Sequence, residues 1–360
     1  MPEISLDDVM QLEDSDPQGM LSMIESFPKQ CLEALKLGTD MLDVPEASGI
    51  KKVAFIGMGG SGIGGQVLRA LLEEPAGLSI SVHRSYKLPS VLGPDTLAVV
   101  VSYSGNTEET LAALDDAVYL GCKIMAVTGG GQLLQKARDF RWPLITVPQG
   151  LQPRAALGYL SLPQAVAMEK MGLIQGFIKV AHECIDYLKD KKEEWGRMSP
   201  LNRNFAKQLA TRLQDKIPVV YGTDGILAVA AYRWKCQFNE NTEIPAFCNM
   251  IPEMDHNEIV GWHGLDEFTR KVELIFLVEE GQDTRMANRV EVTAELLQDR
   301  VGGVTMIHVG GNTPLDKLFS TMYLGDFVST YLALLNGTDP VPVAIISELK
   351  ERMAKVEPGR

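Results

Sequence analysis

A glycine-rich turn between an apolar strand and a helix constrains the fold of this chain more than any other stretch. Residues 53–56 read Val-Ala-Phe-Ile, residues 57–65 contain six glycines, and residues 66–72 have a helical composition. Backbone N–H groups in a turn without side chains can approach a phosphate, and the positive end of the helix dipole favours the negative charge. The stretch therefore predicts an α/β sheet that binds an anion at the end of one strand.

Strand-like and helix-like segments alternate after residue 51. Apolar runs predict five strands in the first half, at residues 53–56, 78–82, 97–101, 123–127 and 144–147. A second alternation predicts strands at residues 217–222, 272–278 and 303–309. Strands that are apolar on both faces are typical of parallel sheets covered by helices on each side. The similar layout of the two halves predicts an internal duplication, in which only the first copy carries the glycine-rich turn.

We therefore expect an α/β protein built from two αβα sandwich domains, each a parallel sheet flanked by helices. The predicted divisions are an N-terminal helical arm at residues 1–47, a first α/β domain at 48–160, a helical linker at 161–200 and a second α/β domain at 201–360. The apolar spacing of the arm favours an amphipathic helix packed on the body, with a dimer arm as the alternative.

Charge and cysteine usage exclude several classes of protein. The formal net charge of −13 over 360 residues offers no basic excess for a nucleic acid, although a small anionic substrate needs only one local positive site. The five cysteines are widely spaced without a C-x-x-C motif, which favours reduced thiols over a disulfide framework or a zinc site. We recognise no signal peptide and no apolar run of about 18 residues. These features predict a cytoplasmic protein with no membrane or nucleic-acid partner.

Three hydroxyl side chains follow the third predicted strand and mark a second loop. Ser102, Ser104 and Thr107 stand on a turn that opens a helix, where hydroxyls and free N–H groups can donate to phosphate oxygens. A capping box with Glu108 or Glu109 would explain one hydroxyl but not all three. Both loops follow the C-terminal ends of sheet strands, where open α/β sheets bind ligands. The phosphate is therefore expected mainly at this second loop, with Gly59, Gly60 and Ser61 of the first loop along the ligand.

The first loop also fits the G-x-G-x-x-G dinucleotide fingerprint at Gly57, Gly59 and Gly62. The acidic residue expected at the end of the second strand is replaced by Arg84, which could suit the 2′-phosphate of NADP. No Gly-Lys-[Ser/Thr] follows, so the turn is not a Walker loop.

The two loops together resemble the sugar isomerase (SIS) domain, which binds phosphosugars through its Ser/Thr loop. The second half narrows the resemblance, because the Asn-Glu-Asn of residues 239–241 and the segment 253–262 resemble the bifunctional phosphoglucose/phosphomannose isomerases of archaea and bacteria. Gln152-Pro153-Arg154-Ala155 is similar to the same family, and the resemblance covers nearly the whole chain. It implies an enzyme that interconverts glucose 6-phosphate, mannose 6-phosphate and fructose 6-phosphate.

An aldose–ketose isomerase needs a base that moves a proton between C1 and C2, a group that opens the sugar ring, and a cation for the enediolate. Glu240 is the expected base, with Glu243 as its competitor. His256 suits ring opening because an imidazole titrates near neutrality. Arg154 is the expected cation, since an arginine stays charged at any working pH. The resemblance implies that His256 acts in the neighbouring subunit's site, which would make the protein an obligate homodimer.

The resemblance also implies a lysine near the C-terminus in ring opening. Lys350 is the match, and Lys317 is the alternative. Relatives often carry Pro-Thr-Pro after an Asp at this point, where this chain has Pro340-Val341-Pro342. If that threonine helps to accept mannose 6-phosphate, the second activity is in question.

No metal and no other cofactor are expected, because an enediol mechanism needs neither and the five histidines form no H-x-H or H-E-x-x-H motif. A phosphorylated hexose is the expected partner. The rival interpretations are a non-catalytic phosphosugar-binding regulator and an NADP enzyme. The absence of a basic helix-turn-helix pattern, together with the presence of Glu240 and His256, favours the isomerase.

Overall fold

The computed structural model describes residues 4–353, 355 and 356. Its first sheet has five parallel strands in the order β2-β1-β3-β4-β5, namely β1 (Lys52–Ile56), β2 (Ser79–His83), β3 (Thr96–Ser102), β4 (Lys123–Thr128) and β5 (Leu144–Thr146). Seven consecutive residues of β3 are buried, as expected for a central strand covered on both faces. The helices of this half are α4 (Gly59–Ala76), α5 (Glu108–Tyr119), α6 (Gly131–Asp139), the 3₁₀ turn η1 (Pro153–Ala155) and α7 (Leu162–Lys170).

The second sheet has four parallel strands in the order β7-β6-β8-β9, namely β6 (Ile217–Thr223), β7 (Phe247–Ile251), β8 (Val272–Glu279) and β9 (Gly303–Val309). Its helices are α9 (Phe205–Arg212), α10 (Ile226–Thr242), η3 (Glu253–His256), α11 (Glu258–Gly261), α12 (Asp266–Thr269), α13 (Thr284–Gln298), α14 (Pro314–Leu335) and α15 (Ala344–Met353). In each sheet the chain first forms an inner strand, then the edge strand on one side of it, and then the strands on its other side. This shared order confirms the predicted α/β class with two similar parallel-sheet units.

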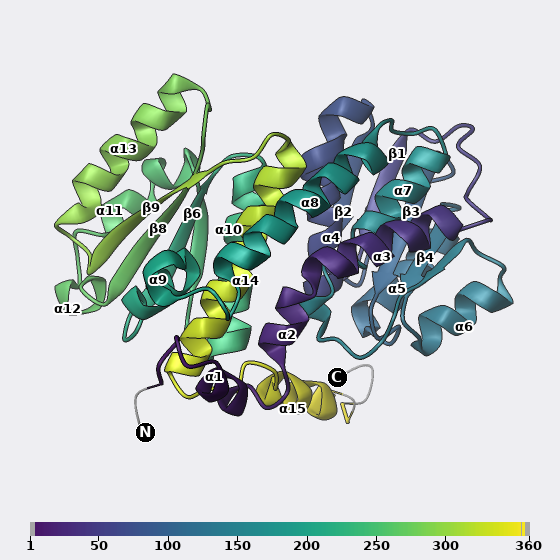
Figure 1. Ribbon diagram of the computed structural model, residues 1–360. Coiled ribbons are helices and arrows are strands. Elements are labelled where there is room, and N and C mark those ends of the chain that lie inside the picture. The colour runs from purple at the N-terminus through teal and green to yellow at the C-terminus, as the bar shows by residue number, and fades with distance from the viewer. Residues whose placement is uncertain (1–3, 354, 357–360) are drawn as a thin grey trace.

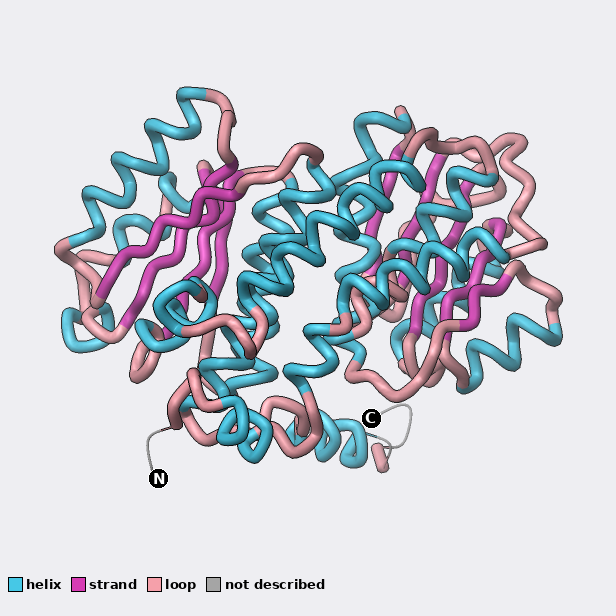
Figure 2. Tube along the Cα trace, in the orientation of Figure 1, coloured by secondary structure: helices cyan, strands magenta, loops and turns pink. Residues whose placement is uncertain are grey.

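Helices α8 (Phe177–Trp195), α10 and α14 run between the two sheets (Figures 1 and 2). The N-terminal helices are α1 (Val9–Ser15), α2 (Met20–Glu25) and α3 (Phe27–Asp40), and η2 (Leu201–Arg203) precedes α9. Helix α3 packs on α7 and α8, and α2 packs on α14. The side chain of Gln18 donates to Asp339 over 2.9 Å, so the first residues lie against the segment that leads into α15.

Helix α14 is long and apolar enough to cross a membrane by length and composition, although the sequence alone led us to expect no such segment. In the structure, 94% of its most apolar window is buried, and it packs against α8, α9 and α10. It is therefore a core helix of the protein.

One local prediction was wrong, and one strand was not predicted. The glycine-rich stretch was expected to be a loop, but α4 begins at Gly59, so most of its glycines lie in the first turns of the helix. Strand β7 was not predicted because Phe247-Cys248-Asn249-Met250-Ile251 mixes polar and apolar residues without alternation. It is an edge strand that exists through its pairing with β6, and only Ile251 in it is buried.

Candidate active site between the two sheets

The first turn of α4 lies directly against the turn that carries Arg154. A Cβ atom at Gly60 would lie 2.6 Å from the backbone carbonyl of Pro153, a distance that leaves no space for any side chain. Only glycine therefore allows α4 and η1 to approach this closely. The approach brings the N-terminus of α4 and Arg154 to the same place.

The guanidinium of Arg154 is fully enclosed and is held from three parts of the chain. Its Nε donates to Asn241 over 2.7 Å, and its Nη2 donates to the carbonyls of Pro340 and Val341 over 2.6 and 2.9 Å. Its Nη1 lies 3.5 Å from the carboxylate of Glu240. Burial lowers the pKa of Arg154 from its ordinary value, and the nearby Glu240 opposes this shift. The same Nη1 donates to Gln152 Oε1 over 3.4 Å. The result is a fixed cation that faces the predicted base.

Glu240 lies in the last turns of α10, and its side chain is 31% exposed. It borders a small cavity together with the predicted residues Gly59, Gly60 and Arg154. Helix α10 contributes four more lining residues that the sequence interpretation missed, at positions 232, 233, 236 and 237. Three of them, Arg233, Cys236 and Gln237, stand 7, 4 and 3 residues before Glu240, the spacing of one helix face. That spacing was the available signal once Glu240 was placed on a helix.

A buried charge network supports this face of α10. Arg233 donates to Asp326 of α14 over 2.7 Å and to the carbonyl of Arg154 over 2.8 Å, while Gln237 donates to the other oxygen of Asp326 over 2.6 Å. Burial raises the pKa of Asp326 from its ordinary value, and Arg233 acts against that shift. Helices α10 and α14 and the Arg154 turn are thus joined through Arg233.

Asp326→Ala is expected to lower the free energy of unfolding by about 3–5 kcal/mol, because it leaves the Arg233 guanidinium buried without its partner. Chemical denaturation measured by circular dichroism checks this value. Asp190→Ala, at an exposed position of α8, is the control and should change stability by less than about 0.5 kcal/mol. A loss in Asp326→Ala no larger than in the control would show that the network contributes no stability.

The hydroxyl loop is joined to the glycine-rich turn by a hydrogen bond. The N–H of Tyr103 donates to Ser61 Oγ over 3.0 Å, and Ser61 directly follows Gly60 in the chain. Ser102 is fully buried, with its Oγ 2.9 Å from Thr107 Oγ1, whereas Ser104 is exposed. Thr107 is the N-cap residue of α5, but no side chain accepts a hydrogen bond from the first turn of this helix. The alternative capping box therefore does not form. The N–H groups at the start of α5 therefore remain available beside the hydroxyls.

His256 and Lys350 lie outside the residues that line the cavity. His256 ends η3, after the edge strand β7. The acids close to His256 in the chain have other partners: Asp255 bonds to Arg289 and Thr293, and Glu258 bonds to Tyr221 and Asn249.

The other residues that the sequence offered for these roles do not line the Glu240 cavity. Lys350 stands on the exposed helix α15, whereas Lys317 bonds to Glu279 over 2.7 Å. Glu243 follows the last residue of α10 and is exposed. Arg84, considered for a 2′-phosphate, lies over the ring of Tyr232 with its guanidinium carbon 4.9 Å from the ring centre. Among the described residues, no group of three or more His, Cys, Asp or Glu side chains is placed to hold a metal ion.

Comparisons with known proteins assign the family. Residues 48–152 match the SIS domain, and residues 202–353 match the bacterial phospho-glucose isomerase C-terminal SIS domain. The chain is 39% identical to a bifunctional phosphoglucose/phosphomannose isomerase of Caldicellulosiruptor bescii, over 94% of this chain and all of that protein. It is 35% identical to a D-glucosamine-6-phosphate 4-epimerase of Sulfolobus acidocaldarius, over 60% of this chain and 66% of that protein.

The fold is shared with a solved hypothetical protein of Thermus thermophilus, which is 16% identical and has a TM-score of 0.71, with 96% of this chain and 95% of that chain covered. The likeness of sequence to the isomerase of Caldicellulosiruptor bescii extends over both sheets and over the segments that carry Arg154, Glu240 and His256. The chain therefore belongs to the bifunctional phosphoglucose/phosphomannose isomerase family of SIS-domain proteins.

Proposed function

We propose that this protein is an aldose–ketose isomerase that interconverts glucose 6-phosphate with fructose 6-phosphate and mannose 6-phosphate with fructose 6-phosphate. The observation that carries the proposal is the placement of the Glu240 carboxylate 3.5 Å from the enclosed Arg154 guanidinium, beside Gly59 and Gly60 at the start of α4. A base beside a fixed cation suits a reaction in which removing a proton creates negative charge on a neighbouring oxygen.

The sugar phosphate is proposed to bind with its phosphate at the hydroxyl loop, accepting from Ser104, Thr107 and the N–H groups that open α5, while the buried Ser102 holds the Thr107 hydroxyl in place. The glycines of α4 then form a wall without side chains along the sugar, and Ser61 links that wall to the loop. This arrangement directs the carbon atoms away from the phosphate towards Arg154 and Glu240.

The proposed chemistry has three steps. His256 of the neighbouring subunit and Lys350 assist ring opening by moving a proton from the C1 hydroxyl of the aldose to the ring oxygen. Glu240 takes the proton from C2 of the open aldose, and the electron pair forms the C1–C2 double bond while Arg154 stabilises the enediolate oxygen. The protonated Glu240 then returns its proton to C1, the proton on the C2 oxygen passes to the C1 oxygen, and the C2 oxygen becomes the ketone before the ring closes.

The direct test is an assay of the purified protein with fructose 6-phosphate in the presence of EDTA and without nucleotide, with both aldose products measured. We expect both glucose 6-phosphate and mannose 6-phosphate to form. Glucosamine 6-phosphate serves as an alternative substrate in the same assay, because one relative is named as an epimerase of that sugar. Tight binding of fructose 6-phosphate without turnover would favour a phosphosugar-binding regulator. A requirement for NADP would favour the dinucleotide alternative.

The balance between the two aldoses is expected to depend on Val341, which occupies the position where relatives often carry threonine. Its carbonyl accepts from Arg154, and its side chain is almost fully buried. Val341→Thr adds a hydroxyl at nearly constant volume. We expect the ratio of mannose 6-phosphate to glucose 6-phosphate turnover to rise by about 2- to 10-fold, the worth of one hydrogen bond. Val356→Thr, at an exposed position, is the control. An unchanged ratio would remove this position from substrate selection.

We also propose a cytoplasmic location, which the scattered cysteines support, and a homodimer in which His256 of each subunit completes the other's site. The position of His256 outside the lining of the Glu240 cavity is consistent with a role in another subunit.

A further inference from the structure

Arg84 carries two hydrogen-bond donors that no described residue satisfies. It follows β2 directly, and its side-chain atoms Nε and Nη2 are both enclosed without a hydrogen-bond partner in the described part of the chain. These two atoms carry the parallel N–H groups of one guanidinium edge, which can bind a carboxylate or phosphate through two hydrogen bonds. Enclosed donors without an acceptor cost free energy. The pair therefore indicates an oxygen ligand from outside the described chain.

The guanidinium of Arg84 lies between α4 and α10. A Cβ atom at Gly62 would lie 2.5 Å from the carbonyl oxygen of Gly57 and 2.9 Å from Arg84 Nε, so glycine at this position leaves the space that the guanidinium edge occupies. On its other side, the guanidinium carbon lies 4.9 Å from the centre of the Tyr232 ring. Tyr232 is one of the residues that line the Glu240 cavity. Arg84 is thus one aromatic side chain away from the proposed sugar site.

The order of the strands decides which end of the sugar is near Arg84. Strands β2 and β3 pair with opposite edges of β1. Arg84, after β2, and the hydroxyl loop, after β3, therefore lie on opposite sides of the turn that leads from β1 into α4. A sugar that is held by its phosphate at the hydroxyl loop, and that lies along the glycines of α4, directs its C1 end towards the side of Arg84.

We propose that Arg84 is a further substrate-binding residue, which turns the Nε–Nη2 edge of its guanidinium from Gly62 to the oxygens at the C1 end of the bound sugar phosphate. The proposal rests on the proposed function for the identity of the ligand. Rotation about the side-chain bonds of Arg84 makes this turn, and the ring of Tyr232 offers the cation a favourable face beside the cavity. The guanidinium then gains the acceptors that it lacks among the described residues.

The next cavity along the contact between α4 and α10 suits an anion less well. Its volume is about 560 Å³, and it is lined by the carboxylates of Glu73, Glu74 and Asp224. Arg69 is the one cation among its lining residues, and its Nε already lies 3.0 Å from the carboxylate of Glu73. Excess negative charge disfavours a phosphate in this cavity.

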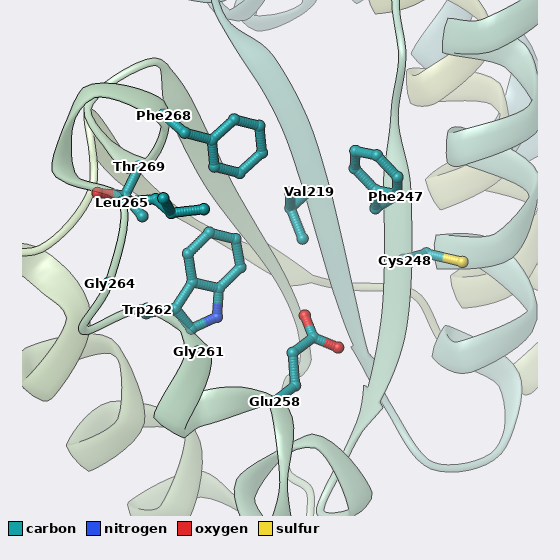
Figure 3. Close-up of a pocket in the computed structure, with 10 residues that line it drawn as sticks. All are labelled: Val219, Phe247, Cys248, Glu258, Gly261, Trp262, Gly264, Leu265, Phe268 and Thr269. Atoms are coloured by element: carbon teal, nitrogen blue, oxygen red, sulfur yellow. The ribbon is translucent and has the colours of Figure 1, made fainter.

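The cavity at the β7 edge of the second sheet is apolar and has a volume of about 410 Å³. Figure 3 shows four large side chains around it, namely Phe247, Trp262, Leu265 and Phe268. Its one lining carboxylate, Glu258, already accepts from Tyr221 and Asn249. Sugar hydroxyl groups need polar partners when they leave water, so this cavity does not compete with the site beside Arg84.

Equilibrium binding to Arg84→Gln tests the proposal. Calorimetric titrations use the Glu240→Gln protein as background, so that the sugar is not converted, with fructose 6-phosphate and inorganic phosphate as separate ligands. The Kd for fructose 6-phosphate is expected to rise by about 10- to 100-fold, the worth of hydrogen bonds to a charged group. The Kd for inorganic phosphate, which needs only the hydroxyl loop, should change by less than about 3-fold at physiological salt.

The matched control is Arg69→Gln, which removes the same charge from a side chain of α4 that is 54% exposed. It should bind both ligands as the background protein does. An unchanged Kd for fructose 6-phosphate in Arg84→Gln, or an equal loss of affinity for both ligands, would overturn the proposal. Binding of NADP that is lost in Arg84→Gln, with unchanged affinity for fructose 6-phosphate, would assign Arg84 to a dinucleotide instead.

Two further variants separate binding from a structural role. Arg84→Met should unfold at the same temperature as the wild type or at a higher one, because it removes two enclosed donors that have no acceptor. Arg84→Lys keeps the charge without the paired donors, so its affinity for fructose 6-phosphate should lie between those of the wild type and Arg84→Gln. A lower unfolding temperature of Arg84→Met with unchanged affinity would make Arg84 a structural residue. Since titration needs no turnover, a wild-type protein that binds fructose 6-phosphate through Arg84 without isomerising it would refute the proposed function and leave this assignment standing.

Discussion

Glu240→Gln is expected to lower kcat for fructose 6-phosphate by about 10²- to 10⁴-fold, the usual contribution of a general base. Glutamine keeps the size of the side chain and can still contact Arg154, but it cannot accept the proton from C1 or C2. KM should change little, because the phosphate is proposed to bind at the hydroxyl loop and not at Glu240. Steady-state kinetics with both aldose products measured checks the expectation.

The matched control for this variant is Glu243→Gln, three residues along the chain. Glu243 is exposed and lies outside the cavity lining, so its variant should retain activity. Exchange of the transferred hydrogen with solvent deuterium gives a second readout, since loss of the base should suppress the exchange together with turnover. Full activity in Glu240→Gln combined with a large loss in Glu243→Gln would transfer the role of base to Glu243.

Subunit mixing is expected to restore activity between two inactive variants. If His256 acts in the neighbouring site, a heterodimer of Glu240→Gln with His256→Ala contains one site with both groups intact and one site with neither. Random pairing makes half of the dimers mixed, so equal amounts should recover about a quarter of wild-type activity. Co-expression with two affinity tags, followed by isolation of the mixed dimer, should raise this value to about half.

The control is the same mixture made from Glu240→Gln and the double variant that carries both substitutions, which contains no intact site under any arrangement. Its activity should equal that of the parent variants. If the mixed dimer of the two single variants also remained at that level, His256 would act within its own subunit, and the shared-site arrangement would be wrong.

Much of the fold was predictable from local patterns. The predominantly apolar strands β1, β3, β4, β6 and β8 are buried on both faces, a constraint that leaves a parallel sheet covered by helices as the outcome. Strand β7 was not predictable in this way, because an edge strand with one buried residue has little burial to impose a pattern. The start of α4 at Gly59 was also missed, since intrinsic helix propensity disfavours glycine and only close packing on η1 explains its use.

The candidate site also has some features that the sequence predicts and others that only the structure shows. The sequence by itself determined the chemical groups: two adjacent strand ends with a glycine turn and a hydroxyl loop, an arginine after Gln152-Pro153, and a glutamate in an Asn-Glu-Asn context. These features are local, because they can be recognised from residue type and short spacing alone. They do not determine which of these groups lie in contact in the folded protein.

Only the tertiary structure decided that Arg154 is enclosed by Asn241 and by the carbonyls of Pro340 and Val341, and that it faces Glu240. These contacts join residues 86 to 187 positions apart, counted from Arg154 to Glu240 and to Val341. Their existence depends on how α10 packs against α4 and α14, and this packing is set by complementary side-chain volumes with no periodic signal in the sequence. The glycine-rich turn that first indicated a phosphate is, in the structure, the surface on which Arg154 can approach the helix.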